Sequence, residues 1–419
     1  MDHGREMLAN NQGRLPLKIH IISNLFAPDQ LAGASLYTDL ALYLRDAGHD
    51  VRVTTTFSYY PAWRIRPEDA GVASRDEVYA GIPIRRVSMF VPECPSGRNR
   101  LMSDLSFFWA LIRRGQFKDW KPDVILTALP MLSQCLAQRF LYFFRGIPRL
   151  IIVQDFAVDA ALELGILRLP GIAWILRAIQ RWALRSASTI TTISPLMLTK
   201  LRQEIGADRR TLLVPNWIDK SLQDEINLQN QSPPTRHASR LFYSGNLGVK
   251  QGLPDFLRQF ADSSGLSAGW DIEICGGGAE KDRLKEMLGS HQGITLGPVL
   301  DEAAYVTKLL TSTACLITQR PGIGANFLPS KLLPALATAT PVLAVCDRSS
   351  PLANEVLEGR FGLVIAPGSP EALTESLDLL RSPSLLAEFS ANAKARAAMY
   401  HREEVLRTFE QELHELHRV

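Results

Sequence analysis

A glycine-bearing loop that ends in a serine and a lysine is the segment of this chain with the clearest chemical content. It runs from Gln319 to Lys331, between an apolar run at 314–318 and a helix-like segment at 332–338. Ser330 is a good helix N-cap, so backbone N–H groups would lie beside the Lys331 ammonium. This arrangement favours a diphosphate group, although an ordinary loop and helix start in an α/β domain has the same signature.

Two other glycine-rich segments in the same half would let backbone approach a phosphate closely. One contains Gly245 and Asn246 and continues to Lys250, which supplies a mobile positive charge. The other is the run 276–278, where a flat nucleobase or ribose would lie against the backbone. Each segment alone is weak evidence, because glycine-rich turns are common after strands in this architecture. Three in one domain favour a nucleotide ligand.

One carboxylate lies where a strand is predicted to end. Asp155 follows the apolar run 150–153, where it would act as a general base or orient an acceptor hydroxyl. Capping of the next helix is an equally ordinary role for it. No Asp-x-Asp pair is suited to a magnesium–diphosphate complex, so charge neutralisation passes to Lys250 and Lys331 and we expect no metal.

The first strand is followed by a small turn, Ala32, Gly33 and Ala34, where backbone would lie near a ligand. The turn lacks the Gly-x-Gly-x-x-Gly pattern of dinucleotide enzymes, which argues against a nicotinamide cofactor. The chain also lacks a Gly-x-Ser-x-Gly elbow, a phosphate-binding Gly-x-x-x-x-Gly-Lys loop and a basic-aromatic nucleic-acid motif. We therefore expect neither a cofactor nor a nucleic-acid partner.

The elements that must position these residues alternate between strand-length apolar runs and helical segments, which predicts an α/β fold with parallel sheets. The expected strands are 18–22, 51–55, 82–87, 124–128, 150–153, 189–193, 212–214, 241–244, 272–275, 294–296, 314–318, 341–345 and 363–365. Serines before Pro195 and Pro370 predict helix starts.

Length and pattern predict two domains with polar ends. We expect a flexible tail at 1–16, a first Rossmann-like domain at 17–219, a second at 220–390 and a C-terminal helix at 391–419 that packs back toward the first. The polar segment 220–240 carries a Pro-Pro pair and is expected to be a linker or surface loop.

Charge is unevenly distributed along the chain. Up to Pro215 there are 27 Lys and Arg against 19 Asp and Glu, and beyond it 19 against 24. Two interpretations explain this equally well: the basic first half faces anionic lipid or a phosphorylated acceptor, or it is an ordinary surface of mixed charge.

The cysteines and the apolar runs bear on the compartment. The five cysteines form no Cys-x-x-Cys pair, which fits a reducing cytoplasm. No secretory signal and no membrane-spanning run of about 20 residues is found, so any membrane contact is expected to be peripheral.

One predicted helix, 171–186, has two distinct faces. Its apolar stripe should face the core, and the stripe comprises Ile172, Ile175, Leu176, Ile179 and Ala183. On the opposite side Trp174 lies among Arg177, Arg181 and Arg185. This combination suits an anionic membrane surface, and a solvated helix face is the competing interpretation.

Taken together, the sequence resembles the retaining glycosyltransferases of family 4, in particular the branch of colanic-acid and related exopolysaccharide enzymes. The resemblance runs from about residue 18 to about residue 400. It is carried by segments such as Tyr59-Tyr60-Pro61-Ala62-Trp63-Arg64, Val214-Pro215-Asn216-Trp217, Tyr243-Ser244-Gly245-Asn246 and Leu328-Pro329-Ser330-Lys331-Leu332-Leu333.

The resemblance implies a GT-B fold, in which two Rossmann-like, doubly wound domains face a central cleft. It implies metal-independent hexosyl transfer with retention, from a nucleotide-diphosphate sugar to a glycan or lipid-linked acceptor in exopolysaccharide biosynthesis. The enzyme would be cytoplasmic and peripheral on the inner face of a bacterial plasma membrane. The implied donor-binding residues are Gly245, Asn246, Lys250, Gly276, Gly277, Gly278, Val299, Ser330 and Lys331. Asp155 and Lys331 would be catalytic, with Ala32, Gly33 and Ala34 near the transferred sugar.

This chain departs from the family pattern at two places. A pair of glutamates common in the family is replaced by Asn326 and Pro334, and a histidine by Gln154-Asp155. Nucleotide base, sugar, acceptor and oligomeric state therefore stay open. Two alternatives also stay open: a nucleotide-sugar 2-epimerase of the same architecture, and a non-catalytic nucleotide-sugar-binding protein.

Overall fold

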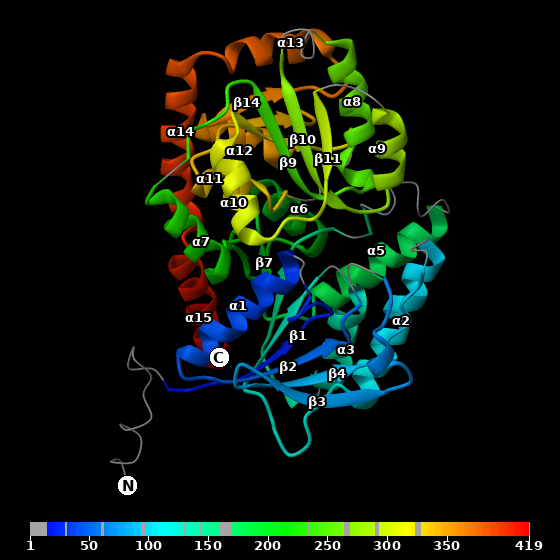
Figure 1. The fold of residues 1–419 in the computed structure, drawn as a ribbon. Coiled ribbons are helices and arrows are strands. Elements are labelled where there is room, and N and C mark those ends of the chain that lie inside the picture. The colour runs from blue at the N-terminus through cyan, green and yellow to red at the C-terminus, as the bar shows by residue number, and fades with distance from the viewer. Residues whose placement is uncertain are drawn as a thin grey trace. The chain divides into compact units, whose positions relative to one another are not determined.

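The computed structural model divides into two compact units (Figure 1). Unit 1 comprises residues 1–215 and 403–419, and unit 2 comprises residues 216–402. These boundaries follow residues 215 and 402, rather than the expected 219 and 390. The structure describes residues 15–29, 32–59, 63–93, 97–129, 131–142, 145–156, 158–159, 170–232, 234–263, 269–289, 293–322 and 328–418.

Unit 1 is built on an eight-stranded sheet of order β3-β4-β2-β1-β5-β6-β7-β8. The strands are β1 (Lys18–Ile22), β2 (Asp50–Thr56), β3 (Ser74–Tyr79), β4 (Ile82–Val87), β5 (Val124–Ala128), β6 (Arg149–Val153), β7 (Thr189–Thr192) and β8 (Thr211–Leu213). Its helices include α1 (Ala32–Asp46), α2 (Gly97–Arg114), α3 (Leu132–Tyr142), α5 (Pro170–Leu184), α6 (Pro195–Ile205) and α15 (Arg402–Arg418). Only β3 is antiparallel to its neighbour, β4, among the pairs in the described chain.

Unit 2 is built on a six-stranded parallel sheet of order β11-β10-β9-β12-β13-β14. The strands are β9 (Arg240–Asn246), β10 (Asp271–Gly277), β11 (Ile294–Gly297), β12 (Ala314–Thr318), β13 (Val342–Val345) and β14 (Gly362–Ile365). The helices are α7 (Lys220–Asn230), α8 (Leu253–Asp262), α9 (Lys281–Leu288), α10 (Glu302–Thr311), α11 (Leu332–Ala337), α12 (Pro351–Gly359), α13 (Pro370–Leu379) and α14 (Pro383–Ala397).

The order of the second sheet reverses between β9 and β12, which are neighbours but not consecutive. In such doubly wound sheets ligands bind beyond the carboxyl ends of the strands at this switch point. Both faces of the sheet are covered, because Phe242 packs into one buried cluster while Leu241 and Tyr243 pack into the other. This alternation along β9 explains why its apolar run is continuous.

Each predicted strand is present, but two expectations about the elements were wrong. The segment 220–240 is not mainly a loop: α7 occupies 220–230, with Asp219 as its N-cap and Ile226 buried. The Pro-Pro pair lies beyond the end of this helix, so it does not disrupt it. Strand β3 was missed because its residues are mostly exposed and charged, so it has no apolar alternation.

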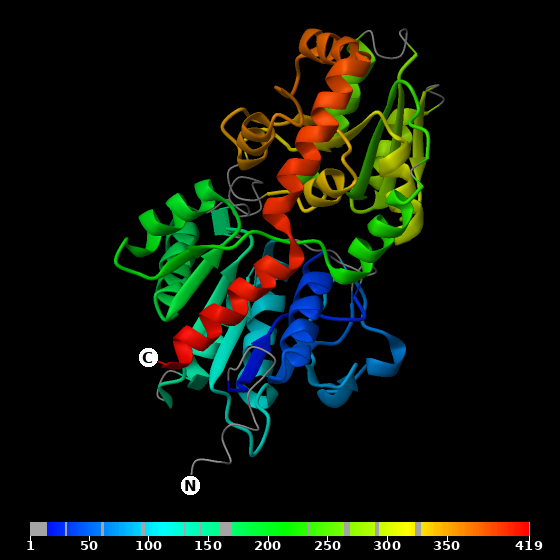
Figure 2. The same ribbon diagram turned by 90° about the vertical axis from the view of Figure 1, so that its left-hand side faces the viewer.

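Helix caps followed the sequence closely. Ser194 accepts a hydrogen bond from the Met197 N–H, and Ser369 accepts one from Ala372, each ahead of a proline. Helix α15 returns to unit 1, where it lies beside α1 in both ribbon views (Figures 1 and 2). Its Glu412 accepts hydrogen bonds from Thr189 at 2.6 Å and from Arg210 at 2.8 Å.

Candidate functional site

The ends of β9 and β10 are in close backbone contact. Their register pairs Gly245 with Gly276 and Asn246 with Gly277. A Cβ at Gly276 would lie 2.0 Å from the Gly245 carbonyl oxygen, and its φ is +153°. Residue 276 must therefore be glycine, since any side chain would push the two strand ends apart.

The other two glycines of this run have different surroundings. A Cβ at Gly278 would meet the Asn246 Oδ1 at 2.5 Å and the Leu247 carbonyl at 2.6 Å. At Gly277 the nearest atom is Val299 Cγ2, at 3.5 Å, which is ordinary contact. Gly276 and Gly278 thus give room to the preceding loop, and a nucleobase or ribose against this run stays a prediction. Val299 itself is 66% exposed.

Lys331 reaches from the segment after β12 to the end of β9. Its Nζ lies 3.6 Å from the centroid of the Tyr243 ring, and a Cβ on Gly245 would be 3.3 Å from the same nitrogen. Tyr243 is held in place because its hydroxyl donates to the Asn246 carbonyl at 2.8 Å. We call the ends of β9, β10 and β12 with these residues the glycine–lysine edge.

The Lys331 ammonium is unusual because it is buried without a hydrogen-bond acceptor in the described part of the chain. The side chain as a whole is half-buried. Burial lowers the pKa of Lys331 to about 7 from its usual 10.5. A buried cation without a carboxylate partner is costly, and an anion bound beside it would offset that cost and restore its charge.

Polar groups at the end of β12 are also unsatisfied. Gln319 is 2% exposed, and neither its side-chain oxygen nor its nitrogen has a hydrogen-bond partner among the residues with described positions. The same is true of the Thr318 hydroxyl. Buried polar groups normally have partners, so this cluster suits a polar ligand. The sequence did not single out Gln319 or Tyr243, although both lie at strand ends next to predicted residues.

The prediction that Ser330 is the N-cap of this helix was wrong. Helix α11 begins at Leu332, and Lys331 rather than Ser330 is its N-cap, with no side-chain cap hydrogen bond. Ser330 is exposed, and the first N–H groups are already used: Leu332 donates to Pro329 at 3.1 Å and Leu333 to Ser330 at 3.3 Å. The group that Lys331 offers to an anion is therefore its ammonium and not the start of α11.

Lys250 lies on the loop after β9, in the 3-10 turn Val249–Gln251. Its carbonyl accepts a hydrogen bond from the Arg320 N–H at 2.9 Å, which joins the loop after β9 to the loop after β12. The chain thus brings Lys250 to the same edge of the sheet. Asn326 lies outside the described residues, and Pro334 is buried in α11.

The predicted residues of unit 1 lie at the carboxyl edge of the first sheet. Asp155 follows β6 and is half-buried. The turn predicted at 32–34 is instead the first turn of α1, which begins at Ala32. Ala34 is fully buried, and a Cβ at Gly33 would make only ordinary contact with Leu25 at 3.7 Å. Asp155 belongs to unit 1 and Lys331 to unit 2.

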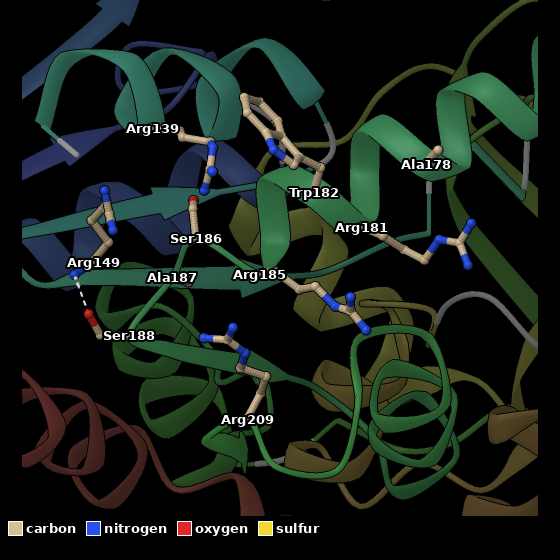
Figure 3. Close-up of a pocket in the computed structure, with 10 residues that line it drawn as sticks. All are labelled: Arg139, Arg149, Ala178, Arg181, Trp182, Arg185, Ser186, Ala187, Ser188 and Arg209. Atoms are coloured by element: carbon tan, nitrogen blue, oxygen red, sulfur yellow. Dashed lines mark hydrogen bonds between the residues drawn. The ribbon is translucent and has the colours of Figure 1, made fainter. Parts of the chain in front are cut away.

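A separate pocket in unit 1 contains none of the predicted site residues (Figure 3). Arginines line it, and three of them, Arg139, Arg149 and Arg209, lie outside the helix that the sequence singled out. That helix, α5, also differs from its predicted pattern. Ile175, expected to face the core, is 50% exposed, and Arg177 forms an ion pair with Asp159 at 2.7 Å.

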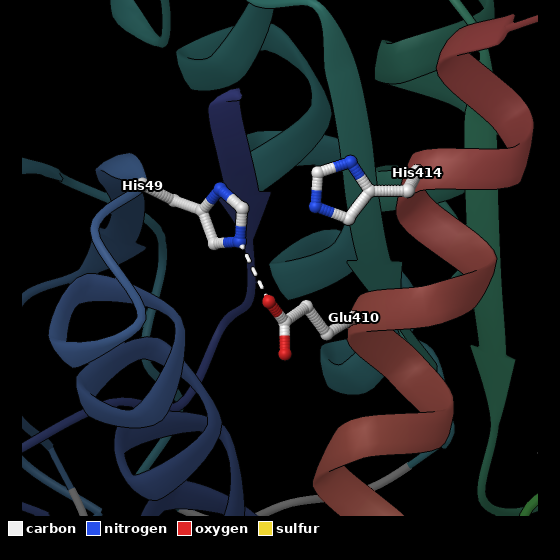
Figure 4. A group of neighbouring side chains, drawn as sticks. All are labelled: His49, Glu410 and His414. Carbon is white, nitrogen blue, oxygen red and sulfur yellow. Dashed lines mark hydrogen bonds and ion pairs between the residues drawn. The ribbon is translucent and has the colours of Figure 1, made fainter. Parts of the chain in front are cut away.

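Three buried side chains have the spacing of metal ligands, with ligand atoms within 4.8 Å of one another (Figure 4). These are His49, Glu410 and His414. The Leu17 N–H donates to His49 Nδ1 at 3.0 Å, so Nε2 carries the proton and donates to Glu410 at 3.3 Å. Because both ring nitrogens of His49 are engaged, this group does not fit a metal. It fastens α15 to unit 1 instead.

Two doubly wound units, one with a glycine–lysine edge at its switch point, define a GT-B protein, and comparison with known proteins agrees. Residues 33–217 match the family described as glycosyl transferase 4-like domain. The Escherichia coli (strain K12) protein WcaI, named as a colanic acid biosynthesis glycosyl transferase, is 28% identical over 94% of this chain and 98% of its own.

Solved structures show the same fold at low identity. Sucrose-phosphate synthase from Thermosynechococcus elongatus has a TM-score of 0.70 at 14% identity, covering 95% of this chain and 99% of its own. Anabaena HepE in complex with UDP-glucose has a TM-score of 0.64 at 14% identity, covering 95% of this chain and 100% of its own. The chain therefore contains a glycosyl transferase 4-like domain and has the GT-B fold.

Proposed function

We propose that this enzyme transfers a hexosyl residue, with retention at the anomeric carbon, from a nucleotide-diphosphate sugar to a lipid-linked glycan in exopolysaccharide biosynthesis. The observation that carries the proposal is the buried Lys331 ammonium, which lies against Gly245 and Tyr243 with no acceptor in the described structure. A diphosphate supplies the missing acceptor. The biosynthetic role rests on similarity to WcaI, whose name refers to colanic acid.

Charge develops on the leaving nucleoside diphosphate as the glycosidic bond breaks. In this proposal Lys331 and the N–H groups of the loop after β9 stabilise that charge, and Lys250 adds a second cation. No divalent metal is needed, because the two lysines supply the neutralisation. Asp155 orients or deprotonates the acceptor hydroxyl. Gln319 hydrogen-bonds the donor, since its buried amide needs a partner.

The donor sugar is best tested by stabilisation of the fold. Tight donors raise the melting temperature by mass action, so UDP-, GDP- and dTDP-sugars should be screened by thermal shift. UDP-glucose is the first choice because HepE was solved in complex with it. A panel without any stabilising donor would contradict the proposal.

Transfer and its stereochemistry require a second experiment. The best donor is incubated with lipid extracts from the producing bacterium, and the new anomeric centre is assigned by NMR. Retention is expected. An inverted product would contradict the retaining mechanism. Interconversion of the donor without acceptor would identify an epimerase, and donor binding without any product would identify a binding protein.

Peripheral membrane contact is the second part of the proposal. Among the described residues no helix is both long and apolar enough to cross a bilayer. Helix α5 nevertheless exposes Trp174 at 68% and Ile175 at 50%, and α2 exposes Trp109 at 54%. Exposed tryptophans on a basic domain suit the inner face of the plasma membrane, where a cytoplasmic enzyme meets a lipid-linked acceptor.

Vesicle flotation tests this contact. Wild type should float with vesicles that contain phosphatidylglycerol, and Trp174→Ala combined with Trp109→Ala should reduce the floated fraction. Leu379→Ala is a matched control, because Leu379 is 49% exposed on unit 2. Equal flotation of wild type and the tryptophan variant would remove this surface from the proposal.

A further inference from the structure

Unit 1 contains a pocket of about 670 Å³, and the charged residues among its described lining are all arginines. None of the described lining residues is an aspartate or glutamate. The residues that matter here are Arg139, Arg149, Arg181, Trp182, Arg185 and Arg209. We call it the arginine pocket (Figure 3).

The arginine pocket lies at the amino edge of the first sheet. Arg149 is the first residue of β6, Ser188 directly precedes β7, and Arg209 comes shortly before β8. These three strands are parallel neighbours, so their amino ends are adjacent. Donor and acceptor chemistry in a doubly wound domain takes place at the opposite, carboxyl edge. The pocket is therefore a different site from the one proposed for sugar transfer.

Guanidiniums gathered around one cavity repel one another. Burial first, and the nearby Arg139 second, lower the pKa of Arg149. Arg209 pairs weakly with Asp208, which lies 4.0 Å from the Arg209 Nε and has a side chain that is 81% exposed. An exposed contact of that length neutralises little charge. A bound multivalent anion would neutralise several guanidiniums at once.

Contacts that need no carboxylate hold several of the arginines in position. The Arg139 guanidinium stacks over the Trp182 ring at 3.9 Å, and the Arg185 Nε donates to the Ile205 carbonyl at 2.9 Å. The backbone of Arg149 is bonded to Ser188 in both directions, at 3.2 Å and 2.8 Å. Arg181 differs, since its guanidinium extends away from the others in Figure 3. The Arg139 and Arg185 guanidiniums are thus held in place, and they lose less entropy when they bind an anion.

We propose that the arginine pocket binds a phosphate or diphosphate group. Guanidinium forks match the oxygens of phosphate bidentately, and several of them around one cavity favour a ligand with more than one negative charge. A carboxylate ligand would leave most of the positive charge unbalanced. The group is carried either by a soluble phosphate compound or by a lipid headgroup. The inference does not depend on the transferase reaction.

Calorimetric titration of the full chain with inorganic pyrophosphate tests the proposal. Arg139→Gln combined with Arg209→Gln should weaken one class of binding at least about tenfold, because two charge-assisted contacts are lost. Arg177→Gln is the matched control, because it removes an arginine of α5 that does not line the pocket. Asp159, the ion-pair partner of Arg177, keeps its second partner Lys200 at 2.6 Å. Lys331→Ala identifies the part of the pyrophosphate binding that takes place at the glycine–lysine edge, because it removes the ammonium there.

The result that supports the proposal is binding that the Arg139/Arg209 variant loses while Arg177→Gln and Lys331→Ala retain it. Pyrophosphate binding of wild-type strength in the Arg139/Arg209 variant, with its melting temperature unchanged, would overturn a soluble phosphate ligand. A second arm then uses phosphatidylglycerol vesicles against pure phosphatidylcholine vesicles.

The vesicle arm separates the two sources of phosphate. A lipid ligand predicts that the Arg139/Arg209 variant loses binding to phosphatidylglycerol vesicles, and that Arg177→Gln keeps it. A soluble ligand predicts pyrophosphate binding with vesicle binding unaffected by the variant. If neither pyrophosphate nor phosphatidylglycerol vesicles distinguish the variant from wild type, the pocket is not a phosphate site.

Discussion

The two sheets share a doubly wound architecture but place positive charge at opposite edges. In unit 2 one buried lysine lies at the carboxyl edge, beside strand ends that glycine allows to approach closely. In unit 1 several arginines line a cavity at the amino edge. Two sheets of the same architecture can therefore bind ligands at different edges, because the side chains at an edge determine whether a ligand binds there.

Two groups of buried polar side chains, one in each unit, show a second contrast. At the glycine–lysine edge, Lys331 and Gln319 are buried without partners in the described structure. In unit 1, buried Glu410 is satisfied by His49 at 3.3 Å and by the Tyr43 hydroxyl at 3.1 Å. Buried polar groups without hydrogen-bond partners lower the stability of the fold, and they are retained where a ligand supplies the partner. Buried polar groups that have partners stabilise the fold. This contrast can be tested by mutation.

The largest effect is expected for Lys331→Ala. Turnover should fall about a hundredfold or more, because loss of one group that stabilises transition-state charge typically costs about 2.7–4 kcal/mol. The measurement is kcat with the best donor and a lipid-linked acceptor. Lys281→Ala, an exposed lysine on α9, is the control and should keep wild-type turnover. Near wild-type kcat in Lys331→Ala would place the chemistry elsewhere.

Glu410→Ala should affect stability rather than catalysis. The free energy of unfolding should fall by about 3 kcal/mol, because His49 and Tyr43 lose their common buried acceptor. Urea unfolding followed by circular dichroism measures it. Glu415→Ala on the same helix is the control: its side chain is 57% exposed and should contribute less than about 1 kcal/mol. Equal losses in the two variants would show that the buried group does not fasten α15.

Gly276→Ala and Gly277→Ala form a matched pair at the glycine–lysine edge. The first should destabilise unit 2 by about 1–3 kcal/mol, because its Cβ would be 2.0 Å from a backbone oxygen. It should also weaken donor binding, since the end of β9 must move. Gly277→Ala meets only Val299 at 3.5 Å and should cost less than about 1 kcal/mol. Unfolding curves and donor titrations that cannot tell the two apart would refute this packing argument.

The smallest effect is expected for Lys331→Met on the ligand-free protein. The pKa of Lys331 is about 7 in the fold, against its usual 10.5 when exposed. Unfolding therefore takes up a proton between these pH values, and the stability contributed by this residue rises as the pH is raised through that range. At pH 7 the methionine variant lacks the buried charge, so its melting temperature should be higher by about 2–4 °C.

Melting curves of wild type and Lys331→Met across that pH range measure the difference. It should be largest at or below pH 7 and shrink toward pH 10.5. Lys281→Met, which removes an exposed charge, should show no such trend. A constant difference between wild type and Lys331→Met would mean that Lys331 does not titrate in this range.

The sequence predicted most of the fold, because burial on both sides of a parallel sheet leaves a continuous apolar run for each strand. Strands β1, β4, β5 and β12 begin and end where those runs do. Strand β3 was missed since an exposed edge strand needs no such run. Helix α7 was missed because its polar surface carries little apolar pattern, with only Ile226 deeply buried.

What the sequence determined by itself was the α/β class, the number of units and the residues at the strand ends, since these depend on local pattern. Tertiary structure alone decided which of those residues meet. Lys331 contacts Gly245 and Tyr243 only because β12 lies beside β9 in the sheet. Likewise, strand order collects Arg139, Arg149 and Arg209 around one cavity, and the return of α15 joins His49 to Glu410. Such contacts depend on the path of the whole chain, and no short stretch of residues encodes that path.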